Sequence, residues 1–253
     1  MVEETRFLGV TIDSKLSWIP HIKQLAKKLK CHIGSLNRIK DNIPNHLHKQ
    51  LYHTLFESHL AYGITVWGGV SFSKLEPIFN LQKKCLRIMF GDKETYLDKF
   101  RTGARSRPLG NQVLGAEFFS REHSKPLFND NNILTLYNLY NYHTTTEVFK
   151  ILKYRTPISL FTSFTTSGRK ETLLITPSSS HGFIHRSSAL WNLVRQKFKI
   201  YEFSAMSIGA LKSRFKNFIS DCQKFGDIIV WKDNEIDAKN ALRFNCLPEY
   251  TLY

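Results

Sequence analysis

Two groups of basic residues are spaced so that each could bind phosphate groups from one face of a helix. The first group is Lys23, Lys27 and Lys30, and the second is Lys83, Lys84 and Arg87. Residues three or four apart share a helix face, so we expect both groups to project from the helices that carry them. A charged face often only keeps a helix solvated, and this alternative stays open for each residue taken singly. The whole set favours a polyanionic partner.

The acidic residues do not form a metal-binding pattern. Nucleotidyl transfer needs two divalent ions about 4 Å apart, held by carboxylates that converge from separate elements. Asp13 has no acidic neighbour that could share an ion with it, and Asp92, Glu94 and Asp98 cluster without a strand–turn context. We interpret these carboxylates as solvated charges and helix caps, and we predict no catalytic residue among them.

Histidines and cysteines do not predict a metal site either. His46, His48, His53 and His59 crowd one segment, but none are four residues apart and no His-Glu-x-x-His motif occurs. The four cysteines lie far apart and form no Cys-x-x-Cys pair, which is typical of reduced thiols in an intracellular protein. We therefore expect no metal and no resident cofactor in this chain.

The composition bounds the class of protein. Hydrophobic residues make up 42% of the 253 positions, enough to exclude wholesale disorder. Thirty-six Lys and Arg against 21 Asp and Glu give a net charge of +15, which favours nucleic acid as a partner, with an anionic membrane surface second. No apolar run approaches the roughly 20 residues of a membrane span, and no signal peptide follows the acidic start. We expect an intracellular protein, nuclear or cytoplasmic, without a membrane partner.

The elements that must position the basic residues are mainly helical. A β-rich run over residues 7–13 has Leu8, Val10 and Ile12 on one face. A strand so near the terminus needs a partner strand, and we expect that the sequence before residue 5 cannot supply one. Three helices follow. Their expected apolar stripes are Ile22, Leu25, Ala26, Leu29, Ile33 and Leu36; Leu47, Leu51 and Leu55 with Tyr52 and Phe56; and Leu75, Ile78, Phe79, Leu86 and Met89.

Local signals mark the two ends of the third helix and the turn before it. Ser73 and Glu76 have the spacing of a capping box at the start of the helix, and Gly91 is a typical stop. Gly68-Gly69 lacks the pattern of a phosphate-binding loop and predicts a turn.

Trp18, Tyr62, Trp67 and Trp191 lie at apolar positions, so we expect these side chains to pack in the core rather than to stack on bases.

The domain organisation follows from these patterns. Residues 1–92 form a strand and a three-helix bundle, residues 93–130 a basic loop or linker, residues 131–225 a looser helical region, and residues 226–253 an irregular tail. Further helices are expected at 131–154, 188–198 and 204–224, with an extended Ser- and Thr-rich connection at 157–180. The fold class is thus mainly α, with a short N-terminal β element, a helical bundle and a looser helical C-terminal region.

A series of short motifs runs in order through the first 92 residues. It comprises Phe7-Leu8-Gly9-Val10, residues 12–18, His21-Ile22, residues 62–64 and 66–68, residues 81–84 and Arg87-Ile88. The series resembles the segment that follows the catalytic palm of jockey-like non-LTR retrotransposon reverse transcriptases. The resemblance is close over residues 5–92 and loose over 123–220. Each motif alone is weak, and the ordered set is fairly specific.

The resemblance implies that Phe7, Leu8, Gly9 and Val10 form a primer grip, and that the helices behind them form a thumb along a primer–template backbone. The family's aromatic-x-Asp-Asp turn and its fingers are absent from these 253 residues. We therefore expect a part of an RNA-directed DNA polymerase, inactive by itself, that binds RNA or an RNA–DNA hybrid without sequence preference. Mg²⁺, which the family uses, would be held by the missing palm, itself a candidate partner.

Two alternatives stay open at this point. The chain could be a helical protein-interaction module, or a transposon remnant without a selected function. Binding to an RNA–DNA hybrid that weakens steeply with salt would favour the first hypothesis, because each neutralised phosphate releases counterions.

Overall fold

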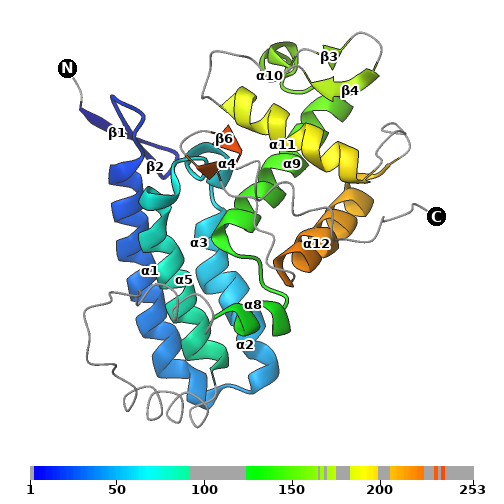
Figure 1. Cartoon of the computed structure of the whole chain (residues 1–253). Coiled ribbons are helices and arrows are strands. Elements are labelled where there is room, and N and C mark those ends of the chain that lie inside the picture. Colours follow the sequence, from blue (N-terminus) through cyan, green and yellow to red (C-terminus); the bar gives the residue numbers. More distant parts are fainter. Residues whose placement is uncertain are drawn as a thin grey trace, which may run out of the picture.

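The computed structural model describes residues 3–91, 124–164, 166–167, 170–174, 183–198, 206–224, 231–232 and 235–236. Within these ranges the protein is mainly helical, with a short antiparallel sheet at its N-terminus, which confirms the predicted fold class (Figure 1). The expectations for residues 101–122, and for most of the tail after 225, lie outside the described residues.

The N-terminal sheet is a hairpin of β1 (Glu4–Phe7) and β2 (Val10–Asp13), in which Phe7 pairs with Val10. The two residues between the strands, Leu8 and Gly9, both have positive φ, 44° and 81°, as a type I′ hairpin turn requires. The prediction of one strand without a partner was therefore wrong, because residues 4–7 supply the partner. The predicted apolar face was also wrong: Leu8 lies in the turn, and the buried residue of β2 is Thr11.

Three helical segments form an up-and-down bundle that extends from the hairpin (Figure 1). They are α1 (Ile19–Ile39); α2 (Asn45–Leu51) continued by the π-helix η2 (Tyr52–Glu57) and α3 (Ser58–Ala61); and α5 (Phe72–Phe90). The connections are η1 (Lys40–Asn42) and α4 (Ile64–Trp67). The His48 ring fixes the far end, because its Nδ1 lies 2.9 Å from the Met89 carbonyl oxygen and its Nε2 lies 3.0 Å from that of Lys40.

Two of the three predicted apolar stripes are confirmed. The stripe of α1 is buried except for Ala26, which is half-buried, and all the residues predicted to face inward from α5 are buried. In the second segment the buried side chains are His48, Tyr52, Phe56 and Leu60, whereas Leu47 is exposed and Leu51 and Leu55 are half-buried. The wider turn of the π-helix keeps residues four apart on one side, so the stripe differs from the predicted one.

The ends of α5 differ partly from the prediction. The helix begins at Phe72 with Ser71 at its N-cap and without a side-chain cap, so the predicted capping box of Ser73 and Glu76 does not form. The helix starts two residues too early for Ser73 to cap it, and the Ser73 hydroxyl instead lies 3.2 Å from that of Ser71. Gly91 ends the helix as predicted, with its amide bonded to the Arg87 carbonyl.

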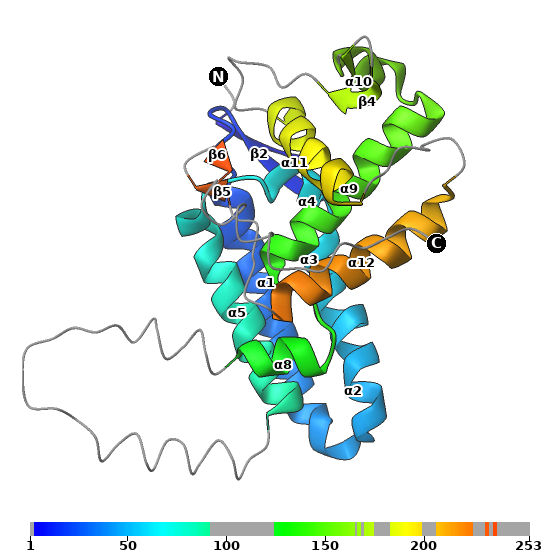
Figure 2. The same ribbon diagram turned by 45° about the vertical axis from the view of Figure 1, so that its right-hand side comes forward.

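The C-terminal region packs around α9 (Leu136–Tyr154), which lies beside α4 and carries α11 and α12 (Figure 2). Its other described elements are α8 (Lys125–Asp130), α10 (Ile158–Ser163), β3 (Thr166–Ser167), β4 (Lys170–Leu174), α11 (Phe183–Phe198), α12 (Ile208–Lys224), β5 (Trp231–Lys232) and β6 (Glu235–Ile236). Helices α8 and α10 occupy positions predicted to be loop or extended chain. Pro126 lies in the first turn of α8 and Pro157 at the N-cap of α10, positions where proline favours a helix start.

The bundle and the C-terminal region share one hydrophobic core. Gln82 of α5 is fully buried at their junction: its amide nitrogen donates to Tyr52 Oη and to the Leu134 carbonyl, each at 2.9 Å. Its amide oxygen accepts from the Leu136 amide at 2.8 Å, so it caps the first turn of α9. Gly68 lies against the Tyr140 ring, so the predicted turn at Gly68-Gly69 is also a packing surface for α9.

Candidate nucleic-acid interface

The turn of the hairpin is held by Tyr62, at the end of the second helical segment. Tyr62 Oη donates a hydrogen bond to the Leu8 carbonyl at 2.5 Å, and its ring lies under Gly9, where a Cβ would approach it to 3.5 Å. Tyr62 is 55% exposed, so the prediction that it packs in the core was wrong. The same prediction holds for Trp67 and Trp191, which are fully buried.

Strand β2 is joined to the first turns of α1 by its buried residue, Thr11. The Thr11 hydroxyl donates to Gln24 Oε1 at 2.9 Å, and the Thr11 amide lies 3.4 Å from His21 Nδ1. The His21 ring packs on Trp67 with 5.5 Å between centroids, and burial lowers its pKa, with Lys28 adding to the effect. These contacts fix the hairpin at the start of α1, so the position of one determines the position of the other.

Asp13 holds the turn that leads into α1. Its carboxylate accepts hydrogen bonds from the amides of Ser17 at 3.0 Å and Trp18 at 2.9 Å, and these bonds lower its pKa. Both amides precede Ile19, the first residue of α1, so the carboxylate fixes the turn before the helix and complements the positive end of the helix dipole. Asp13 therefore has a structural role at the base of the hairpin.

The three predicted lysines of α1 are all exposed. Lys23, Lys27 and Lys30 lie on one flank of the helix, away from the buried stripe. Lys28 lies on the other flank, beside the stacked rings of His32 and His59, whose centroids are 4.4 Å apart. Helix α1 carries these four lysines and Arg38 but no acidic residue, and none of the four lysines has an ion-pair partner among the described residues. The flank with Lys23, Lys27 and Lys30 is a surface of uncompensated positive charge that begins next to the hairpin.

The three predicted basic residues of α5 have different environments. Lys83 is only 5% exposed, and its ammonium lies 4.9 Å from the centroid of the Phe79 ring. The expectation that Lys83 projects into solvent was wrong, because the neighbouring Phe79 ring also contacts Phe128 and Tyr137 and this side of α5 is covered. Lys84, about 100° further around the helix, is exposed, and Arg87 is half-buried. Of these three residues, only Lys84 is fully available to a large partner.

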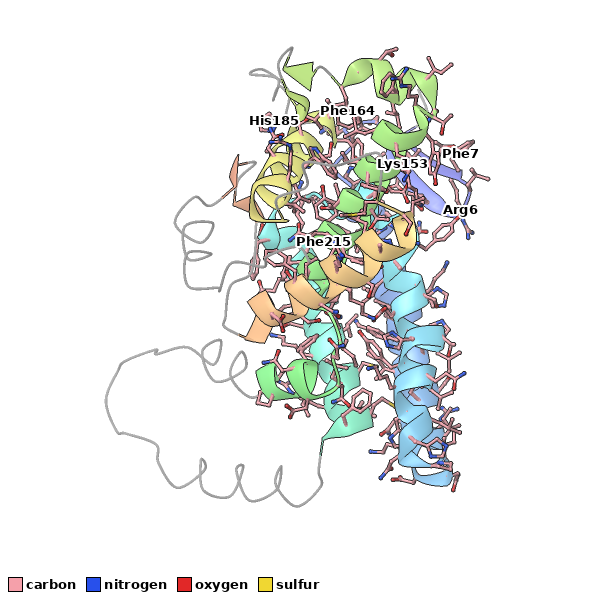
Figure 3. The ribbon with its side chains drawn as sticks, turned by 90° about the vertical axis from the view of Figure 1, so that its right-hand side faces the viewer. Arg6, Phe7, Lys153, Phe164, His185 and Phe215 are labelled. Carbon is pink, nitrogen blue, oxygen red and sulfur yellow. The ribbon has the colours of Figure 1, made fainter. Side chains whose placement is uncertain are left out.

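The tip of the hairpin is apolar and open. Phe7 is 63% exposed and Leu8 is 74% exposed, while Val10 is half-buried. Figure 3 shows Phe7 and the exposed Arg6 at the outer edge of the hairpin. Tyr62 and Val66, both more than half exposed, extend the apolar character toward α4. An apolar tip beside a cationic helix can contact sugars, bases or another polypeptide while the lysines contact phosphates.

The comparisons with known proteins add no assignment. No family model, curated protein or solved structure matches the chain. Among the described residues, no helix combines the length and the apolar character needed to cross a membrane. In the same part of the chain, no three His, Cys, Asp or Glu side chains are grouped as metal ligands would be.

Sequence reasoning missed two features of this surface. The first is Arg6, an exposed cation that directly precedes the Phe7-Leu8-Gly9-Val10 motif. Its place next to this motif is the sequence signal that could have found it. Tyr62 was assigned to the core, because the sequence does not show that the second segment ends where the hairpin turn needs a hydrogen-bond donor. The lysines of α1 were found because charge and helical period coincide there.

Proposed function

We propose that this chain binds the phosphate backbone of RNA or of an RNA–DNA hybrid, as the primer-grip and thumb part of a reverse transcriptase. The observation that carries the proposal is the flank of α1: Lys23, Lys27 and Lys30 are exposed, lie in one row, and belong to a helix without acidic residues. Three cations about one helical turn apart can each neutralise a phosphate of the same backbone.

The hairpin gives this surface a direction. Because Thr11 and Tyr62 fix the hairpin to α1 and to the second segment, the apolar tip and the lysine row form one rigid unit. Phe7 and Leu8 then contact the strand end or the polypeptide that carries the metal centre, while the lysines follow the backbone away from it. Lys84 adds one exposed cation on the neighbouring helix α5, whereas the buried Lys83 supports the packing of α5.

The experiment is a salt titration of binding to a labelled RNA–DNA hybrid. For the wild-type chain we expect log K to fall with log salt with a slope of roughly −4 or steeper. The variant Lys23→Gln/Lys27→Gln/Lys30→Gln should lose affinity, and its slope should become shallower by about 0.9 for each lost phosphate contact.

A charge-matched control separates this surface from net charge. The variant Lys49→Gln/Lys150→Gln/Arg214→Gln removes the same number of charges from α2, α9 and α12. It should keep the wild-type slope. Equal losses in both triple variants, or binding that does not depend on salt, would contradict the proposal and would favour a protein-interaction module or a chain without a binding function.

A further inference from the structure

A cavity of about 310 Å³ lies between the second helical segment and the C-terminal region. Its walls come from η2 and α3, from α9 and the residues just before it, and from α12. The lysines of α1 do not line it. The volume falls within the range of sites that enclose small molecules.

One side of the cavity is cationic. Lys212 and Lys216 lie one helical turn apart on α12 and line the cavity together with His53 and Glu57 of η2. Glu57 Oε1 is 3.0 Å from His53 Nδ1, so the one carboxylate of the lining is already engaged by a histidine. Neither lysine has an ion-pair partner among the described residues. The lining therefore holds two lysines whose charge an anionic ligand would neutralise.

The wall that α9 contributes is aromatic and apolar. Tyr142 lines the cavity, and its ring stacks on the ring of Phe215, with 6.1 Å between the ring centroids and 16° between the ring planes. Phe215 is fully buried on α12 (Figure 3), so the Tyr142 ring is held in place. Leu134 and Leu139 complete this wall, and His143 also lines the cavity. A rigid aromatic ring beside apolar side chains suits a flat ligand group.

The backbone at this cavity is unusual for an independent reason. His53 and Glu57 both belong to η2, the π-helical part of the second segment. π-helical turns are rare and occur frequently at functional sites. Here the π turn directs Tyr52 and Phe56 into the core and leaves His53 and Glu57 on the cavity.

We propose that this cavity binds a nucleoside monophosphate, with its phosphate on Lys212 and Lys216 and its base against Tyr142 and the leucines. The two lysines supply the charge that a phosphate needs, and Tyr142 and the leucines supply the apolar surface that a planar base needs. Burial lowers the pKa of His143, while Glu57 and Glu147 oppose the shift and Lys212 and Lys150 add to it. The lowered pKa favours the neutral ring, which can donate or accept a hydrogen bond.

Calorimetric titration of the full chain with adenosine monophosphate, adenosine and inorganic phosphate tests the proposal. We expect the monophosphate to bind at one site, and adenosine and phosphate each to bind at least about tenfold more weakly. The variant Lys212→Gln/Lys216→Gln should weaken the monophosphate at least about tenfold. The control Lys49→Gln/Arg214→Gln, which removes the same charge from α2 and from α12 between the two lysines, should bind as the wild type does.

Other outcomes would overturn the assignment. Absence of monophosphate binding at about millimolar concentration removes the site. Phosphate binding as tight as that of the monophosphate would leave only an anion site, and equal losses in both double variants would leave only non-specific charge. The triple variant of the α1 lysines should bind the monophosphate normally, so failure of this site and failure of the proposed α1 surface are distinguishable.

Discussion

Replacing Gln82 with Met tests how the bundle is joined to the C-terminal region. The Gln82 side chain is fully buried and takes part in three hydrogen bonds, to Tyr52, Leu134 and Leu136. Met has a similar length and no strong donor or acceptor, so it preserves the packing and leaves a hydroxyl, a carbonyl and an amide without partners. Each orphaned buried group costs about 1–3 kcal/mol, part of which the apolar Met side chain offsets.

We therefore expect Gln82→Met to lower the free energy of unfolding by about 3 kcal/mol. For a chain of this size that corresponds to a decrease in Tm of about 6–12 °C. Urea unfolding followed by circular dichroism measures the loss. Gln50→Met is the matched control, because Gln50 is exposed on α2 and its replacement should change stability by less than about 0.5 kcal/mol. If the two variants were equally stable, the three bonds would not join the two regions as described.

Three further predictions concern single positions. Gly68→Ala should lower the free energy of unfolding in urea by about 1–3 kcal/mol, because the added Cβ would lie 2.5 Å from a backbone carbonyl oxygen. Gly34→Ala is the control: no atom lies within 4 Å of the new Cβ, so this change should stabilise α1 by about 0.5–1 kcal/mol. Burial lowers the pKa of His21 in the folded state, so the unfolded chain binds the proton more readily. The free energy of unfolding should therefore decrease as the pH falls below about 6.5. His21→Gln should flatten this pH dependence, which urea midpoints between about pH 7.5 and pH 5.5 measure. Lys84→Gln should weaken hybrid binding without changing stability, and Lys83→Gln should lower the stability of the fold; the reverse pattern would contradict their assigned environments.

The long helices could be predicted from the sequence because their burial follows a single period. In α1 the residues Ile22, Leu25, Leu29, Ile33 and Leu36 are spaced three or four apart, and all face the core. Such a stripe is a property of the segment itself, so no knowledge of the neighbouring helices is needed to find it. The exposure of Lys23, Lys27 and Lys30 follows from the same period.

The second segment and the hairpin could not be predicted in this way. The π-helical turn at Tyr52–Glu57 changes the register of burial, and no local pattern announces it. The turn at Leu8 places a non-glycine residue at positive φ, which sequence preferences disfavour. In both places, contacts with distant residues decide the conformation: Gln82 bonds to Tyr52, and Tyr62 bonds to Leu8.

The environment of Lys83 shows the same limit within the candidate site. Lys83 and Lys84 are adjacent, equally charged and equally expected to project, yet only Lys84 is exposed. The difference arises from Phe128 on α8, which packs on Phe79, 49 residues away in sequence, and closes that side of α5. Helical period predicts which residues share a side, but the partner helix decides which polar side is covered.

The charge on α1 has a cost that bears on its function. Lys23 and Lys27 are four residues apart, and Lys27 and Lys30 are three apart, so each pair repels across one turn by about 0.2–0.5 kcal/mol. Acidic residues on the same helix would remove this cost, and α1 has none. The helix is stable because its apolar stripe is buried, since each large side chain removed from water contributes about 1.5–3 kcal/mol. Core packing thus permits a row of like charges that adds nothing to folding, and a polyanion lying along that row would relieve the repulsion.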